Sequence, residues 1–171
     1  MGRANYLRDF IRDYSTLSQP LHQLLTDYNK TRRVVWTPES TAAFHEMKLA
    51  ISKCTTMHLI SDTAQITLHT DASDYGVVGH LFQIVDGIDQ PVAFVSKSLN
   101  KSQLRWSVIQ KEAYGIFFSC KYLQSLLRDR FFTIRTDHRN LLFITEASNP
   151  MIVRWYMALS EISFSLEFIP V

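Results

Sequence analysis

QITLHTDASDYG, residues 65 to 76, joins a strand pattern to an acidic end. Apolar and polar side chains alternate from Ile66 to Asp71, which is the period of two that is typical of a β-strand. The strand is therefore expected to end at Asp71, where Asp71-Ala72-Ser73 is also compatible with an Asx-type turn. An aspartate in this place is an ordinary turn former when it stands alone, and a metal ligand when other carboxylates meet it.

The residues downstream predict further strands and helices, which together define the fold class. Asp86-Gly87 is a turn signal between two strand patterns, and Ser107 has capping-box spacing to Gln110 before a long apolar stripe. The predicted elements are strands at 65–71, 76–85, 91–96, 131–137 and 164–168, a long helix after Ser107, and a helix from Asn149-Pro150 to about residue 160. This order predicts an α/β fold, with a mixed sheet and helices on its faces.

The residues upstream of the sheet have helical spacing instead. Apolar side chains recur at helical intervals from Leu7 to Tyr14 and again from Leu21 to Leu25, and Thr37-Pro38 is an N-cap followed by proline at the first helical position. Three short helices are expected here. We therefore divide the chain into a helical appendage over residues 1–57 and a sheet domain over residues 58–171.

Composition limits the classes of function. The 171 residues are 46% hydrophobic and carry a formal net charge of +2, which allows a sizeable core and permits a phosphate-bearing partner. The two cysteines, Cys54 and Cys120, are too few for a disulfide framework or a zinc knuckle, so we expect a reducing compartment, with Cys120 in the core. No apolar run approaches the ~20 residues of a membrane span. We expect an intracellular, cytoplasmic protein without a membrane partner, with a virus-like particle or the nucleus as alternative locations.

Three acidic residues are predicted to converge at one end of the sheet. Asp71 and Asp137 end strands that a crossover helix would place side by side, ~4.8 Å apart. Glu112 lies in the first turns of the long helix, on the flank of the apolar stripe and directed toward the sheet. Taken singly, the aspartates remain compatible with turns, and Glu112 with a partner of the helix dipole.

Together, these carboxylates indicate metal-dependent chemistry. Clustered carboxylates raise one another's pKa unless divalent cations offset their charge. Oxygen ligands with no cysteine or pair of histidines beside them favour Mg²⁺ or Mn²⁺ over zinc. Two such ions about 4 Å apart suit the hydrolysis of a phosphodiester bond. The spacing therefore favours a nuclease.

Three segments resemble the motifs of ribonuclease H domains in gypsy-type LTR-retrotransposon reverse transcriptases. They are LHTDASDYG at 68–76, RWSVIQKEAYGI at 105–116 and RTDHRNL at 135–141. VAFVSKSLN at 92–100 is similar to the family's third strand. NYLRDFI at 5–11 and WTPESTAAFHEMK at 36–48 resemble the end of the polymerase thumb and the segment that leads into the nuclease. The resemblance covers nearly the whole chain.

The resemblance implies a ribonuclease H-like fold with a five-stranded mixed sheet, and a role in cleaving the RNA strand of RNA–DNA hybrids. It places the metal-binding, catalytic roles on Asp71, Glu112 and Asp137, with two Mg²⁺ or Mn²⁺ ions in the complete site. It also implies an upstream polymerase domain in the same polyprotein. The family's fourth aspartate lies in a motif beyond the last strand, and the sequence ends at Val171. We therefore expect a domain that is truncated at its C-terminus and cleaves weakly.

Four residues near these motifs are candidates for contacts with nucleic-acid phosphates: Arg105, Arg135, His138 and Arg139. As an alternative they are solvated surface charges. Trp106 and Trp155 are expected to pack in the protein rather than to stack on bases.

The sequence leaves several points open. One departure from the family pattern is Val78, which stands where a second glycine is usual, with Gly79 after it. The alternative function is a non-catalytic scaffold that binds hybrid, like the connection domain of retroviral reverse transcriptases. An integrase-like nuclease is less consistent with the spacing of the acids. The oligomeric state is left open.

Overall fold

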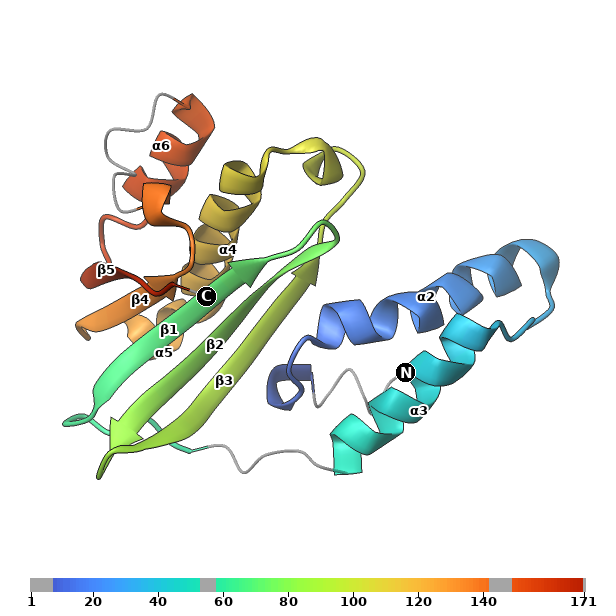
Figure 1. The fold of residues 1–171 in the computed structure, drawn as a ribbon, viewed down its shortest axis with the longest axis horizontal. Coiled ribbons are helices and arrows are strands. Elements are labelled where there is room, and N and C mark those ends of the chain that lie inside the picture. Colours follow the sequence, from blue (N-terminus) through green and yellow to red (C-terminus); the bar gives the residue numbers. More distant parts are fainter. Residues whose placement is uncertain (1–7, 53–57, 142–148, 171) are drawn as a thin grey trace.

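A mixed five-stranded sheet forms the centre of the molecule in a computed structural model that describes residues 8–52, 58–141 and 149–170 (Figure 1). The strands lie in the order β3-β2-β1-β4-β5. Their bounds are β1 Gln65–Ala72, β2 Gly76–Val85, β3 Ile88–Ser98, β4 Phe132–Thr136 and β5 Phe164–Phe168. The first three strands are an antiparallel meander, while β4 runs parallel to β1 and β5 runs parallel to β4. The predicted α/β fold class and the five strands are confirmed.

The hairpin between β2 and β3 turns where the sequence predicted it. Asp86 and Gly87 have φ values of 53° and 75°, the positive pair that a two-residue type I′ turn requires. Val85 pairs with Ile88 directly across this turn. The third strand is longer than the predicted 91–96, because pairing to β2 continues on both sides of that range.

Among the described residues, the α-helices of the sheet unit are α4 Val108–Tyr122, α5 Gln124–Leu127 and α6 Pro150–Met157. Helix α4 begins with the predicted capping box, in which Ser107 and Gln110 satisfy each other's backbone N–H groups. Asn149 caps α6 by accepting a hydrogen bond from the Met151 N–H at 3.0 Å. The short α5 was not predicted, since its four residues are too few to show a period.

Helix α4 packs across β1 and β2 and closes the main core. The core includes these fully buried side chains: Leu68, Leu81, Cys120, Leu127, Phe132 and Ile134. Cys120 is therefore the core residue that the sequence predicted, and burial raises the pKa of its thiol to about 12. Cys54 lies outside the described residues.

Gly79 on β2 allows α4 to approach the sheet closely. A Cβ atom there would lie 2.7 Å from Cγ2 of Val95 and would also collide with the Ser119 hydroxyl on α4. Both neighbours are buried, so neither has room to move away. The close approach at this glycine is therefore made by the protein's own helix.

The described residues of the N-terminal part form a 3-10 turn, η1 Arg8–Phe10, and two helices, α2 Tyr14–Thr31 and α3 Pro38–Ser52. The prediction of three short helices was wrong in this detail, because α2 runs through Pro20 without a break. Leu21 and Tyr14 of α2 pack with Ala43 and Met47 of α3 in a small second core. This burial outweighs the backbone hydrogen bond that proline cannot donate.

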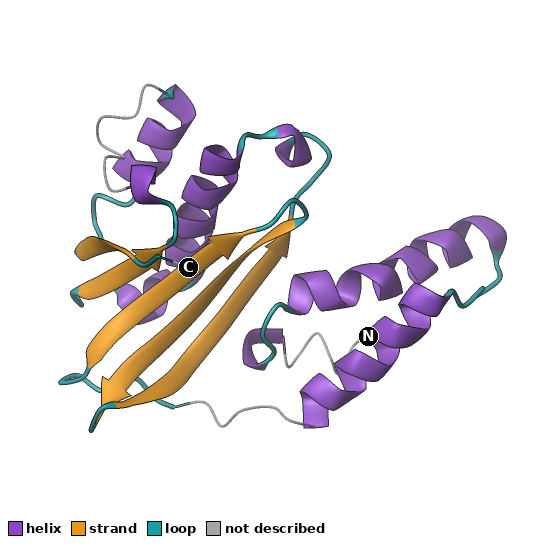
Figure 2. Cartoon of the chain, in the orientation of Figure 1, coloured by secondary structure: helices purple, strands orange, loops and turns teal. Residues whose placement is uncertain are grey.

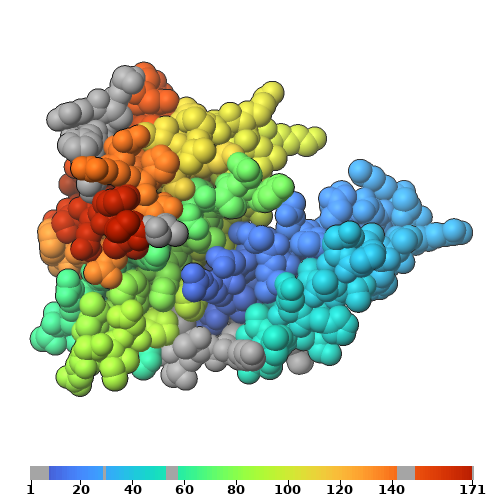
Figure 3. Space-filling model, viewed as in Figure 1, coloured from blue at the N-terminus to red at the C-terminus, as the bar shows by residue number. Residues whose placement is uncertain are grey.

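The pair of helices α2 and α3, here called the helical pair, packs against the edge strand β3 through α2 and η1 (Figures 1 and 2). The guanidinium of Arg8 donates to the Ser96 carbonyl at 2.9 Å, and the backbone N–H of Ser15 donates to the Ser96 hydroxyl at 3.0 Å. The far end of the pair projects from the sheet as a separate lobe (Figure 3). The predicted division at residue 57 falls at the edge of a segment outside the described residues. Among the described helices, none is long and apolar enough to cross a membrane.

Candidate metal centre

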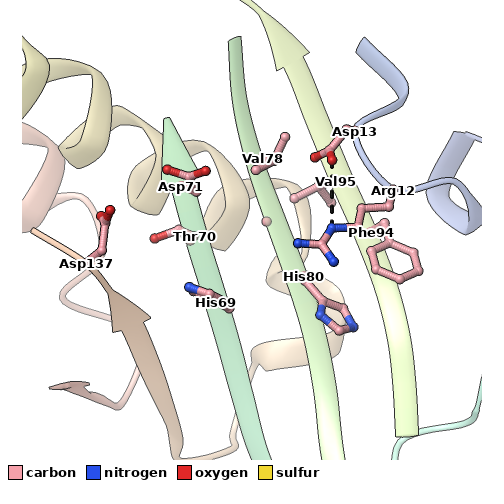
Figure 4. Close-up of a pocket in the computed structure, with 11 residues that line it drawn as sticks. Arg12, Asp13, His69, Thr70, Asp71, Val78, His80, Phe94, Val95 and Asp137 are labelled. Atoms are coloured by element: carbon pink, nitrogen blue, oxygen red, sulfur yellow. Dashed lines mark ion pairs between the residues drawn. The ribbon is translucent and has the colours of Figure 1, made fainter. Parts of the chain in front are cut away.

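Asp71 and Asp137 come together because their strands are adjacent and parallel. Asp71 is the last residue but one of β1, and Asp137 directly follows β4. His69 pairs with Arg135 where β1 and β4 run parallel, so continuing the same register by two residues brings Asp71 level with Asp137. Figure 4 shows both carboxylates at the same end of the two strands, in front of α4. The sheet topology alone therefore places two carboxylates side by side.

Glu112 reaches the same place from the first turns of α4. Its side chain is almost fully buried, with a relative exposure of 3%. Burial, followed by the negative charges of Asp71 and Asp137, raises the pKa of the Glu112 carboxyl to about 8. A hydrogen bond from the Ala72 backbone acts in the opposite direction. The three predicted acids thus influence one another electrostatically.

Two carboxylate oxygens at this point lack the partners that buried oxygens usually have. Within the described part of the chain, Oε2 of Glu112 and Oδ1 of Asp137 are buried and accept no hydrogen bond. A buried acceptor without a partner costs about 1–3 kcal/mol, and more when it is charged. A divalent cation would offset this cost because it supplies the missing positive partner. The residues present therefore fit a hard metal ion.

A histidine also belongs to this cluster. Ligand atoms of Glu112, Asp137 and His138 all lie within 4.8 Å of one another. Asp71 is not part of that close group; its exposed carboxylate lines the adjoining pocket (Figure 4). From the sequence, only carboxylates were expected at the metal, and His138 was a candidate for phosphate contacts. The turn after Asp137 brings His138 next to these carboxylates, so its imidazole is a candidate metal ligand as well as a candidate phosphate contact.

The loop after Asp71 is fixed to the helix that carries Glu112. Lys111, which is buried, forms an ion pair with Asp74 at 2.8 Å. The Ser73 hydroxyl accepts hydrogen bonds from the backbone N–H groups of Tyr75 and Gly76 at 3.2 and 3.1 Å. The ion pair lowers the pKa of Asp74 and links the end of β1 to the start of α4. These contacts limit how far Asp71 and Glu112 can separate.

The four residues that were candidates for phosphate contacts differ in their exposure and in their partners. Arg105 is exposed in the 3-10 turn η2 Gln103–Arg105, between β3 and α4, and Arg139 is exposed after β4. Arg135 on β4 forms an ion pair with Glu167 of β5 at 2.7 Å. Of the four candidates, His138 alone is in the group of close metal-ligand atoms with the carboxylates.

Trp106 and Trp155 pack inside the protein, as predicted. The ring centroids of Trp106 and Trp155 are 5.2 Å apart, and both rings contact Tyr114 of α4. These contacts join η2, α4 and α6 in a small apolar cluster beside the main core. Neither ring is free to stack on a base without breaking this cluster.

A pocket of about 180 Å³ adjoins Asp71 and Asp137 on the sheet face opposite α4 (Figure 4). Its floor includes His69 and His80 from paired positions of β1 and β2, and its wall includes Arg12 from the N-terminal part. Burial lowers the pKa of both histidines, that of His80 to about 4. The alternation of β1 predicts that residues 69 and 71 share a face, but no sequence signal predicts Arg12, which arrives through tertiary packing.

Comparisons with known proteins agree with this fold. A family model described as "RNase H-like domain found in reverse transcriptase" matches residues 61–162. The Tf2-3 and Tf2-4 transposon polyproteins of Schizosaccharomyces pombe are 36% identical to the chain over 179 aligned residues, which cover 99% of the chain. The chain spans only 13% of the length of these relatives.

Solved structures with the same fold include two of the foamy viral protease-reverse transcriptase. The complex with dsDNA has a TM-score of 0.79 at 14% identity, over 98% of this chain and 36% of that one. The complex with RNA/DNA hybrid has a TM-score of 0.73 at 16% identity, over 97% of this chain and 24% of that one. With the match over residues 61–162, the chain belongs to the family of RNase H-like domains found in reverse transcriptases.

Proposed function

We propose that this chain is the ribonuclease H of a retrotransposon reverse transcriptase, which hydrolyses the RNA strand of RNA–DNA hybrids. The observation that carries the proposal is the convergence of Asp71, Glu112 and Asp137 at one end of two parallel strands, with buried oxygens that lack partners. A structural role does not account for these groups, because packing alone is better served by apolar side chains.

The three acids have complementary tasks in this proposal. Glu112 and Asp137 supply buried oxygens that hold a cation away from bulk water, and the more exposed Asp71 supplies oxygens toward the pocket where a scissile phosphate would lie. Two bound Mg²⁺ or Mn²⁺ ions would supply an activated water and stabilise the leaving oxygen. The ion pair between Lys111 and Asp74 keeps the helix and the strand end in register.

We also propose the partners of this domain, from its similarity to ribonuclease H domains of reverse transcriptases. An RNA–DNA hybrid is the substrate, read through the 2′-hydroxyls of its RNA strand. Arg105 and Arg139 are exposed and free of ion pairs among the described residues, so they are the better candidates for phosphate contacts than Arg135. The relatives are transposon polyproteins, so an upstream polymerase domain of the same polyprotein is the second partner. We place the protein in the cytoplasm, with a virus-like particle or the nucleus as alternatives.

The test is cleavage of a labelled RNA strand annealed to DNA, with Mg²⁺ and with Mn²⁺. It is run on this chain and on a longer piece of the polyprotein that includes the aspartate expected after the last strand. Asp71→Asn should lower the cleavage rate at least about a hundredfold in both. The matched control is Asp89→Asn on β3, an exposed aspartate outside the metal centre, which should leave the rate unchanged.

The outcomes separate the two functions. Metal-dependent cleavage that Asp71→Asn abolishes supports the nuclease. Binding of hybrid without cleavage, in the chain and in the longer piece, would contradict it and favour the connection-like scaffold. Cleavage that survives Asp71→Asn would assign the chemistry to other residues.

A further inference from the structure

His138 lies where a metal ligand would lie. Its imidazole is within 4.8 Å of carboxylate oxygens of both Glu112 and Asp137. The backbone around it is fixed, because its N–H donates to the Thr136 hydroxyl at 3.1 Å and its carbonyl accepts from the Leu141 N–H at 2.9 Å. Leu141 is buried in the main core, so the turn is anchored at both ends. The imidazole is therefore held near the carboxylates by the fold.

A second, independent observation indicates that this cluster faces a ligand. Glu112 is 97% buried, and its Oε2 accepts no hydrogen bond from any described residue. Oδ1 of Asp137 is buried and unpartnered in the same region. If His138 were a neutralising hydrogen-bond donor to either oxygen, that oxygen would have a partner. Three side chains that can bind a metal therefore lie together, and two of them have a buried oxygen without a partner among the described residues.

We propose that Glu112, Asp137 and His138 together form one mixed nitrogen–oxygen metal site, in which the imidazole favours Mn²⁺ over Mg²⁺. Magnesium is a hard ion that prefers oxygen and keeps its octahedral water shell. Imidazole nitrogen is a softer ligand that transition-metal ions accept more readily. The inference rests on the proposed nuclease function and assigns a metal preference to one of its two ion positions.

The geometry distinguishes His138 from the other histidine near the acids. His69 lines the adjoining pocket and pairs with Arg135 across the strands, but it is not in the close group of ligand atoms. A contact of His138 with a phosphate would leave the cation at Glu112 and Asp137 without the nitrogen that lies beside their oxygens. Coordination of a metal satisfies all three groups at once.

The test uses Mn²⁺ as a spin probe on the intact chain. Pulsed electron paramagnetic resonance should detect coupling between bound Mn²⁺ and a histidine nitrogen, and labelling the wild-type protein with ¹⁵N-histidine should change that coupling. His138→Gln should remove it. The matched control is His45→Gln, an exposed histidine of α3, which should retain it.

Calorimetric titrations measure the preference directly. His138→Gln should weaken Mn²⁺ binding about tenfold or more, while Mg²⁺ binding changes less than about twofold. Mn²⁺ bound in the wild type without nitrogen coupling would overturn the inference and leave the proposed function intact. If neither ion binds in a manner sensitive to Asp137→Asn, both fail. The labelled wild type keeps the test valid if His138→Gln does not fold.

Discussion

The sheet unit and the N-terminal helical pair bury their apolar surface to very different extents. Around α4, the sheet closes a large core in which many side chains are fully inaccessible. The helical pair has a small core and leaves these large apolar side chains exposed: Leu25, Tyr28, Val34, Val35, Trp36, Phe44 and Leu49. The candidate metal centre stands on the well-packed unit, where three elements can hold carboxylates against their mutual repulsion.

The two regions also differ in how well their local signals agree with their structure. Helix α4 starts with a capping box and carries Glu112 on a buried flank. The N-cap residue of α2, Asp13, is in the left-handed conformation and makes no side-chain cap, and the helix contains Pro20. Helix α4 is therefore specified locally, whereas α2 depends on its neighbours.

Truncating one leucine in each core should give the largest difference between the regions. Leu68→Ala removes a fully buried side chain at the centre of β1 and should lower the free energy of unfolding by about 4 kcal/mol. Leu21→Ala, in the small core, should cost about 2 kcal/mol, because the helical pair can partly collapse around the cavity. Urea denaturation of both variants measures the two costs. Equal costs would show that the two cores are equally rigid.

Titration of the buried Glu112 should produce the next effect, a dependence of the free energy of unfolding on pH. The pKa of Glu112 is raised to about 8 in the folded chain and is near its usual 4.5 in the unfolded chain. Between these values the unfolded chain loses the proton first, so stability should fall as pH rises from about 4.5 to 8, by up to about 1.4 kcal/mol per unit. Below and above this window, Glu112 should contribute no slope.

Denaturation at several pH values, with and without Mg²⁺, checks this dependence. Glu112→Gln should flatten the slope and stabilise the metal-free protein near pH 8, while Mg²⁺ should restore stability to the wild type only. The matched control is Glu46→Gln on α3, an exposed glutamate that should keep the slope. A slope that persists in Glu112→Gln would assign it to another group.

Much of the sheet unit could be predicted because its signals are local. The alternation of β1, the pair Asp86-Gly87 and the caps Ser107 and Asn149 each specify their own element through hydrogen bonds or backbone conformation within a few residues. The placement of the acids followed from one further rule, that a strand, a helix and a strand in succession give parallel neighbours.

The features that escaped prediction depend on packing between distant segments. Helix α2 continues through Pro20 because α3 covers its apolar side, which no local pattern reveals. The position of His138 depends on the turn after β4, and that turn is set by Leu141 entering the core. Arg12 reaches the pocket because η1 and α2 pack against β3. In each case the contact that fixes the position joins residues from separate segments, so no local periodicity in the sequence predicts it.

Weakening the contact between the helical pair and β3 should lower the free energy of unfolding less than truncating a leucine in either core. Ser96→Ala removes the hydroxyl that accepts from the Ser15 backbone N–H and should cost about 1 kcal/mol. Hydrogen exchange should then accelerate in the first turns of α2, while Mn²⁺ affinity stays the same. Ser98→Ala, exposed near the end of the same strand, is the matched control. A change in metal affinity in Ser96→Ala would show that the helical pair acts on the metal centre.

Replacing Pro20 should give the smallest effect, with the opposite sign. Pro20 cannot donate to the carbonyl of Thr16 one turn earlier, so Pro20→Ala restores a helical hydrogen bond. Part of the gain is offset because proline also restricts the unfolded chain, which leaves a net stabilisation of about 1 kcal/mol.

Thermal and urea denaturation of Pro20→Ala measure this gain, with Gln19→Ala as the control for a substitution at an exposed neighbour. The control should change stability by less than about 0.5 kcal/mol. If Pro20→Ala destabilises the protein instead, the conformation that proline imposes on α2 is required for docking to β3. Helix α2 would then be shaped by the sheet and not by its own sequence, which would make the contrast with α4 sharper still.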